Sequence, residues 1–216
     1  MWFCGWADHF RVNFGSEDDE RNWQSPAEAA GAGAEWKNPS AGWHADGGWY
    51  VRFLDSFEVG LQTLTLWSDS QPRGGGTFLA CDSVGVVARY LAEHPEGDRS
   101  GMFTPPLISK FLSQCSDFME IVGEVGDVYL IHPFMLHAGS RNALRVPRII
   151  MNTHARLKQP MNFNRQNADE FSLVERGILR GLGKERLDFA PKAQRERIER
   201  DSGGVRVYKS YVTCVG

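Results

Sequence analysis

The feature that most restricts the fold of this chain is a series of short apolar segments separated by turn-forming residues. Residues 61–67 are rich in threonine and apolar side chains, which is typical of a strand. The next segment, 71–76, reads Gln-Pro-Arg-Gly-Gly-Gly and predicts a turn. Further strands are predicted at 9–14, 49–54, 77–81, 118–122, 127–132 and 147–155. Such a series predicts an antiparallel sandwich or barrel.

Helical patterns lie between and after these strands. Apolar periodicity predicts helices at 84–94 and 105–115, and capping-box spacing predicts helices at 25–30 and 172–181. A charged segment that begins at Pro191 predicts a helix over 191–200, and alternation at 205–212 predicts a last strand. Without a visible linker, we expect one domain over residues 1–216, with its core at about 9–155 and a helical cover at 158–216. The long polar connection at 15–40 is expected to be a lid.

Composition and charge exclude several function classes. The net charge is −3 with both signs interspersed, which argues against a nucleic-acid-binding surface. No apolar run approaches the length of a membrane span, and the first residues lack the pattern of a secretory signal. A cytoplasmic location is therefore the default expectation. The four cysteines have no metal-finger spacing and are expected to be structural or free thiols.

A histidine and a carboxylate stand two residues apart at His44 and Asp46. In an extended segment, positions i and i+2 project to the same face, so both side chains could bind one metal ion. The third ligand must come from elsewhere, and His137 is the best candidate. Two histidines and one carboxylate with open coordination positions form the facial triad that is typical of non-haem Fe(II) oxygenases. On its own, however, the tripeptide is a weak signal that an exposed loop could also carry.

The order of motifs along the chain raises the specificity of this prediction. The sequence resembles the phytanoyl-CoA dioxygenase-like family of Fe(II)/2-oxoglutarate-dependent oxygenases over about residues 43–153. The residues that carry the resemblance are His44, Asp46, Gly74–Thr77, Gly126–Val128, His132, Pro133, His137, Asn142 and Arg148. The arginine eleven positions after the distal histidine makes this ordered set more specific than any single motif.

The resemblance implies a mainly β fold, a double-stranded β-helix (jelly-roll, cupin-like) core with flanking helices. It also implies that His44, Asp46 and His137 bind Fe(II), and that Arg148 pairs with the distal carboxylate of the cosubstrate 2-oxoglutarate. A guanidinium group matches a carboxylate with two parallel hydrogen bonds, which supports the role of Arg148 independently. Thr77 is expected to assist that carboxylate, although a plain strand threonine is an equal alternative. Asn13 is a further candidate contact, at the keto-acid end of the cosubstrate.

Other residues have simpler interpretations or depart from the family pattern. Arg145 is the rival of Arg148 but precedes Val-Pro at a loop edge. His132 is expected to be a core histidine with its hydrogen bonds satisfied, and His154 could face either the pocket or solvent. Gly139 stands where many family members have a hydroxyl residue, so a second cosubstrate anchor is in doubt. The chain is also short at its N-terminus for this family.

These observations together predict an enzyme, a 2-oxoglutarate-dependent dioxygenase. It would use O2 to oxidise a small organic molecule, releasing succinate and CO2. One alternative is a jelly-roll binding protein that keeps the fold without turnover or holds another metal. Another is hydrolysis at zinc, for which no general base is evident. Neither the substrate nor the oligomeric state follows from the sequence.

Overall fold

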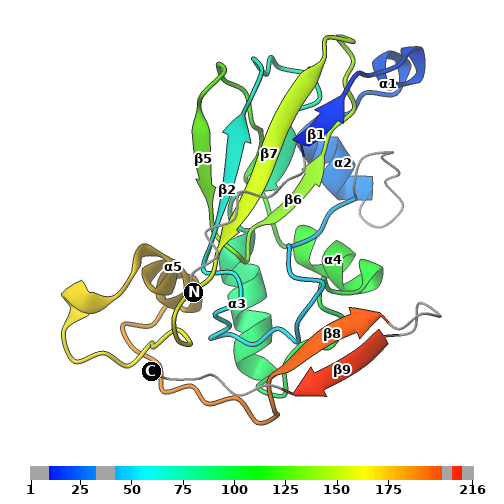
Figure 1. Ribbon diagram of the computed structural model, residues 1–216. Coiled ribbons are helices and arrows are strands. Elements are labelled where there is room, and N and C mark those ends of the chain that lie inside the picture. The colour runs from blue at the N-terminus through cyan, green and yellow to red at the C-terminus, as the bar shows by residue number, and fades with distance from the viewer. Residues whose placement is uncertain (1–9, 33–41, 201–205, 211–216) are drawn as a thin grey trace.

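Two antiparallel sheets form the centre of the molecule. The computed structural model describes residues 10–32, 42–200 and 206–210 (Figure 1). The larger sheet has the order β1-β7-β2-β5, with β1 (Phe10–Asn13), β7 (Arg148–Ala155), β2 (Leu61–Leu66) and β5 (Val128–Ile131). The smaller sheet has the order β4-β3-β6, with β4 (Phe118–Glu120), β3 (Thr77–Ala80) and β6 (Leu136–Gly139). The predicted class of antiparallel sheets with flanking helices is thus confirmed.

The two sheets enclose an apolar cluster between them. Along β2, half-buried and buried residues alternate, so Leu64 and Leu66 point to the same side. Ile150 of β7 pairs with Leu66 and shares that face. The whole cluster consists of Leu64, Leu66, Leu79, Ile121, Ile131 and Ile150. Because Leu79 belongs to the smaller sheet, the sheets must pack face to face through these side chains.

Helices cover the opposite face of the smaller sheet. Phe78 of β3 and Leu136 of β6 are buried in a larger cluster, to which side chains from several helices contribute. These helices are α2 (Pro26–Ala32), α3 (Ser83–Glu93), α4 (Pro105–Leu112) and α5 (Leu173–Leu182). On the larger sheet, by contrast, the outward side chains of Val128 and Leu130 are 54% and 68% exposed. The apolar core is therefore asymmetric, with the smaller sheet in its middle.

Local sequence signals explain several helix ends. The predicted capping box is present in α5, where the Ser172 hydroxyl accepts the Glu175 N–H and the Glu175 carboxylate accepts the Ser172 N–H. The helix ends at Gly183, whose φ of 65° favours glycine. The short helices α1 (Glu17–Arg21) and η2 (Ala168–Glu170) complete the set. No helix in the described ranges has both the length and the apolar character needed to cross a bilayer.

The connection at 15–40 is only partly visible. Residues 17–21 and 26–32 form α1 and α2, and Ala29 and Ala30 of α2 belong to the larger apolar cluster. This part of the connection therefore packs on the body of the protein. Residues 33–40, which belong to the predicted lid, lie outside the described residues.

The prediction of a helix at 191–200 is wrong. Residues 196–200 form strand β8 (Glu196–Arg200), which pairs with β9 (Arg206–Ser210) in an antiparallel hairpin. The single apolar residue of β8, Ile198, is buried against Val51 and Phe53, so contacts distant in sequence decide its conformation. The strand predicted at 49–54 is also absent as such. Tyr50 and Arg52 form only isolated bridges, and the segment joins β8 through the Val51 N–H and the Glu196 carbonyl at 2.9 Å.

Candidate metal site

The backbone holds His44 and His137 directly opposite each other. The His44 N–H donates to the His137 carbonyl at 3.0 Å, and the His137 N–H donates to the His44 carbonyl at 2.9 Å. Residues that exchange both hydrogen bonds in this way project their side chains to the same face. The ring centroids are accordingly 4.4 Å apart. A residue ninety-three positions later in the chain thus becomes the neighbour of His44.

Asp46 completes a group of three potential ligands. Its Oδ1 is 3.4 Å from His44 Nε2, and its Oδ2 is 3.5 Å from His137 Nε2. One ligand atom from each of the three residues lies within 4.8 Å of the others. Ligands about 2.1 Å from an ion and on one face of an octahedron are roughly 3 Å apart. The three side chains therefore need only small adjustments to bind a single ion.

Hydrogen bonds fix which nitrogen of each imidazole is open. His44 Nδ1 is 2.7 Å from the Gly42 carbonyl, and His137 Nδ1 is 3.0 Å from the Met135 carbonyl. A carbonyl only accepts, so each Nδ1 carries the proton and donates, and each neutral ring keeps the lone pair on Nε2. Within the described residues, the buried His137 Nε2 has no hydrogen-bond partner. Metal-binding histidines commonly donate their other ring N–H to a carbonyl in this way, which orients the ring.

The Asp46 carboxylate is surrounded by donors. Burial raises its pKa, but the neighbouring imidazoles of His137, His154 and His44 lower it, and the net result is a pKa well below the usual range. Gln62 Nε2 donates to Oδ2 at 2.6 Å, and His154 Nε2 lies 3.1 Å from the same oxygen. Asp46 is therefore an ionised candidate ligand whose carboxylate is oriented from β2 and from β7.

A fully buried arginine fixes the backbone of the His44–Asp46 loop. Arg52 is 0% exposed and lies over the rings of Tyr50 and Phe103. Its guanidinium donates to the carbonyls of Pro133 at 3.2 Å, Ala45 at 3.3 Å, Gly101 at 3.2 Å, and Asp46. At Gly47, with φ of 135°, a side chain would overlap Arg52 and Tyr50. Arg52 thus connects the loop to two distant segments.

Arg148 faces the interior of the sandwich at the first position of β7. It shares its strand face with Ile150 of the apolar cluster and is 4% exposed. Its Nε donates to the Gly75 carbonyl at 2.5 Å, but its Nη1 is buried without a hydrogen-bond partner among the residues that the structure describes. Burial and the nearby Arg11 lower its pKa to about 10, against the opposing effect of Glu120. A buried cation with an open donor is an attractive site for a carboxylate.

Arg145, the rival of Arg148, has a different environment. Its side chain is 50% exposed and lies 3.4 Å from Glu20. Its φ of 55° places it in a turn, as expected for a loop-edge residue. Of the two arginines, Arg148 is the one that faces the sandwich interior.

The remaining predicted contacts lie toward the Arg148 end of the sandwich. Thr77 is 6% exposed and pairs with Gly139, two positions from the Leu79–His137 pair, so it shares the face of His137. Asn13 pairs with Arg148 in the strand register. Its amide already donates to the Ser140 carbonyl at 3.1 Å and accepts the Gly15 N–H at 3.0 Å.

The structure also identifies residues that sequence reasoning missed. Gln62 and Arg52 were not considered, and Glu120, which lies near Arg148 and accepts the Gly76 N–H at 3.2 Å, was not considered either. Gln62 left a signal, because it shares the inner face of β2 with two leucines and a polar residue there needs a partner. Of the two orientations expected for His154, the structure shows the one toward the pocket, where it contacts the candidate ligand Asp46. Arg52 and Glu120 left no comparable signal, because their partners are distant in sequence.

Comparisons with known proteins add little to this geometry. No protein-family model matches the sequence, and no curated protein matches it. Among solved structures, the chain is similar to EctD from S. alaskensis in its apoform, with 16% identity and a TM-score of 0.32. The match covers 53% of this chain and 42% of the EctD chain. So distant a likeness carries no argument, and the functional case depends on the residues themselves.

Proposed function

We propose that this chain is an Fe(II)/2-oxoglutarate-dependent oxygenase of the phytanoyl-CoA dioxygenase-like type. The observation that carries the proposal is the convergence of two imidazole Nε2 atoms and one ionised carboxylate, with both Nδ1 atoms already bonded to carbonyls. Two neutral nitrogen ligands and one anionic oxygen ligand suit Fe(II) and leave coordination positions for other molecules. The two facing sheets would then be the halves of a double-stranded β-helix.

Each residue has a defined task in this proposal. His44, Asp46 and His137 would hold Fe(II), and Gln62 and His154 would orient the Asp46 carboxylate. When bound, Fe(II) and 2-oxoglutarate supply an O2-dependent oxidation in which one oxygen atom enters succinate, the other enters the substrate, and CO2 is released. The chain itself binds the cosubstrate and keeps water out of the sandwich interior.

Arg148 would bind the distal carboxylate of 2-oxoglutarate. Its unpaired Nη1 offers a donor inside the sandwich, and a lone carboxylate buried there would otherwise cost several kcal/mol. Thr77, on the face that also carries His137, would offer a hydroxyl along the path between the metal and Arg148. The expected contact of Asn13 with the keto-acid end of the cosubstrate has no support in this geometry, because Asn13 pairs with Arg148 and its amide is engaged with Ser140 and Gly15.

Anaerobic metal loading of the purified chain tests the proposal. We expect one Fe(II) per chain, a visible charge-transfer band when 2-oxoglutarate is added, and slow succinate release once O2 is admitted. Metal binding without the band or succinate would instead support a binding protein that retains the fold. Tight binding of zinc in preference to iron, with hydrolytic activity, would support the zinc alternative. Substrates are then sought among small organic molecules, as compounds that accelerate succinate release.

A further inference from the structure

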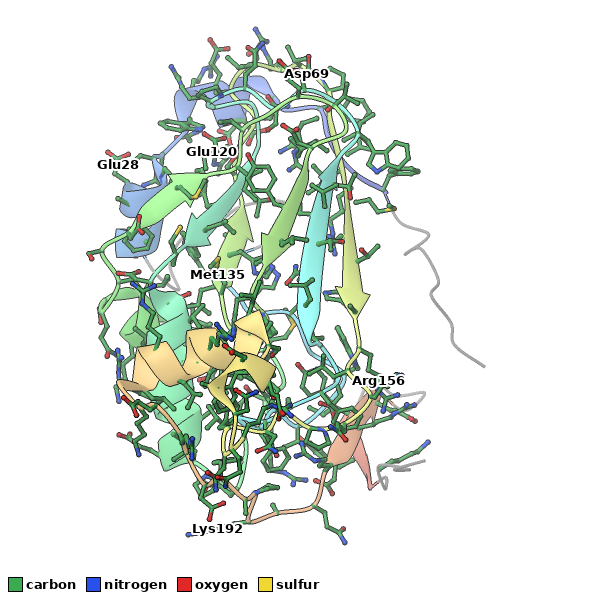
Figure 2. All side chains as sticks on the ribbon, turned by 90° about the vertical axis from the view of Figure 1, so that its left-hand side faces the viewer. Glu28, Asp69, Glu120, Met135, Arg156 and Lys192 are labelled. Carbon is green, nitrogen blue, oxygen red and sulfur yellow. The ribbon has the colours of Figure 1, made fainter. Side chains whose placement is uncertain are left out.

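A cavity lies beyond the end of β7 that does not hold the metal ligands. It has a volume of about 310 Å³, which is at the small end of the range for small-molecule sites. Its lining includes Trp49, Glu58, Arg156, Arg197, Ile198 and Glu199. Figure 2 shows Arg156 past the end of β7, beside the β8–β9 hairpin. The segment after the His44–Asp46 loop and strand β8 therefore form two of its walls.

Two side chains in contact, Trp49 and His154, connect this cavity with the candidate metal site. The Trp49 ring lies against the His154 ring, with centroids 5.4 Å apart. His154 Nε2 in turn is 3.1 Å from Asp46 Oδ2. Trp49 thus contacts the cavity and also the residue that orients a metal ligand. A molecule seated against Trp49 would therefore be two side chains, Trp49 and His154, from the Asp46 carboxylate.

The cavity and Arg148 lie at opposite ends of the same strand. Arg148 is the first residue of β7, and Arg156 immediately follows its last residue. Eight residues of extended chain span roughly 26 Å. His154, which contacts Asp46, lies near the Arg156 end. The cosubstrate and a second molecule could therefore approach the metal from opposite directions without competing.

Arg156 is a cation of the cavity whose charge acts on the nearby Glu58 carboxyl without a direct pairing contact among the described residues. Its guanidinium lies 4.7 Å from the centroid of the Phe57 ring, and in the described ranges it makes no ion pair and no side-chain hydrogen bond. Glu199, in contrast, is paired with Lys209 at 2.5 Å. Glu58 accepts the Phe57 N–H at 3.0 Å, and burial raises its pKa. The open charge is thus positive.

The apolar part of the lining is equally specific. Trp49 presents an indole ring that is 43% exposed, and Ile198 adds a buried aliphatic surface. A ligand with an apolar body and one anionic group matches both features, because the body removes apolar area from water and the anion pairs with a guanidinium.

We infer that this cavity binds the substrate of the proposed oxygenase, and that the substrate is a small organic acid whose carboxylate pairs with Arg156 while its apolar body lies on Trp49. Only one part of this inference, that the bound acid is the substrate, rests on the proposed function. The binding of an organic acid at Arg156 stands or falls by itself.

Binding is measured first on the metal-free full-length chain by ligand-observed NMR and calorimetry. The probes are hexanoate, benzoate and phenylacetate, with hexylamine and 1-hexanol as matched compounds of other charge. An excess of 2-oxoglutarate is present to occupy Arg148. We expect at least one acid to bind at millimolar concentration or below, and the amine and the alcohol to bind at least tenfold more weakly.

Variants assign the binding to the cavity. Arg156→Gln is expected to weaken acid binding at least tenfold, and Arg156→Lys to restore part of it, since an ammonium lacks the two-bond geometry. Arg21→Gln is the control, because Arg21 is an exposed arginine of α1 with a side chain 76% exposed. Three results would overturn the inference: no acid binds, binding is unchanged in Arg156→Gln, or the amine binds best and loses affinity in Glu58→Gln.

The iron-loaded chain separates the two proposals. An acid that binds should accelerate succinate release in the wild type but much less in Arg156→Gln. Acid binding without any succinate would reject the oxygenase and leave the cavity assignment standing. Succinate release that no acid affects in either protein would reject the cavity as the substrate site and leave the oxygenase standing.

Discussion

His132 and His137 are five residues apart and both are largely shielded from solvent, but their ring nitrogens differ in hydrogen bonding. His132 uses both nitrogens, since Nδ1 accepts the Phe134 N–H at 3.0 Å and Nε2 lies 3.2 Å from the Val174 carbonyl. His137 uses only Nδ1, and its buried Nε2 faces Asp46. A buried polar atom left open costs free energy, so it is an indicator of a missing partner. Burial alone would not have separated a structural histidine from a ligand.

The same distinction applies to one pair of arginines, Arg145 and Arg148. Arg145 and Arg148 are three positions apart, and only Arg148 combines burial with an open donor. In both pairs, the residue with unsatisfied hydrogen-bonding capacity is the one that the proposed function uses. Substitutions can therefore test whether metal and cosubstrate binding depend on the atoms without a hydrogen-bond partner, His137 Nε2 and Arg148 Nη1, and not on burial alone.

The largest effect is expected at the two histidines. His137→Ala removes one of three protein ligands, so stoichiometric Fe(II) binding should be lost while the domain stays folded. His132→Phe should retain one Fe(II) per chain, because neither of its nitrogens is available to a metal. Metal analysis after anaerobic loading, with circular dichroism to check folding, measures both. Full iron occupancy in His137→Ala would show that the open nitrogen is not a ligand.

The next largest effect is expected at the two arginines. Arg148→Ala should weaken 2-oxoglutarate binding by roughly 2–4 kcal/mol, since removal of one partner of a buried charge pair costs about that much. Arg148→Lys should rescue only part of the loss. Arg145→Ala should have little effect, because its side chain is half exposed. Titration of 2-oxoglutarate into the anaerobic Fe(II) protein measures all three through the charge-transfer band.

A loss at Arg145→Ala with a wild-type titration for Arg148→Ala would reverse the assignment of the two arginines. Fe(II) affinity should be the same in all of these variants, because neither arginine is placed among the ligands. A change in iron affinity would mean that the substitution disturbs the sandwich rather than the cosubstrate.

A smaller effect is expected at Gln62, which touches a ligand without being one. Gln62→Met keeps the volume but removes the 2.6 Å hydrogen bond to Asp46. Fe(II) affinity should fall about 10- to 100-fold, as for other contacts that orient a ligand. Gln114→Met, at an exposed amide next to α4, is the control and should bind iron normally. Equal iron affinity in both variants would mean that His154 alone orients the carboxylate.

The last effect concerns His132, whose nitrogens are both hydrogen-bonded, and it is measured as a change in stability and not in ligand binding. Burial lowers the pKa of His132 to about 4, against an opposing hydrogen bond with the Val174 carbonyl. Between pH 6.5 and 4 the unfolded chain binds a proton that the folded chain does not, so this contribution to stability is present above pH 6.5 and is lost as the pH falls. The loss approaches about 1.4 kcal/mol per pH unit.

Urea unfolding at pH 7, 6 and 5 tests this linkage. His132→Phe has no group to protonate, so its stability should fall less steeply with acid than that of the wild type, whatever its stability at pH 7. Other groups titrate in both proteins, and the difference between the two slopes isolates His132. Parallel slopes would mean that His132 is protonated with equal ease in the folded and the unfolded chain.

The sequence predicted the parts of the fold in which local pattern and tertiary environment agree. The predicted strand at 61–67 is present as β2, along which half-buried and buried residues alternate because one face lies in the apolar cluster. Helix α5 begins at its predicted capping box. The prediction of a helix at 196–200 was wrong because Glu-Arg-Ile-Glu-Arg has the composition of an exposed helix. The pairing with β9 and the burial of Ile198 against Val51 and Phe53, 147 and 145 positions earlier in the chain, make it a strand.

The candidate site divides in the same way. His44 and Asp46 could be paired from their spacing, and the structure brings His137 beside them as the motif context had indicated. Arg52 could not be found, because its role depends on the Pro133 carbonyl 81 positions away. The cavity at Arg156 was equally out of reach, since its walls come from three separate parts of the chain.

The buried Arg52 has a consequence for how a metal would enter. Its guanidinium already holds the carbonyls of Ala45 and Asp46 against those of Pro133 and Gly101. The His44–Asp46 loop therefore has little conformational entropy left to lose when an ion binds. The affinity of the site for the ion is then not reduced by the free-energy cost of ordering this loop. Loading should be fast and reversible, and removal of the ion by a chelator should leave the loop in place. In this respect the chain differs from small zinc domains, whose ligands are brought together only by the metal itself.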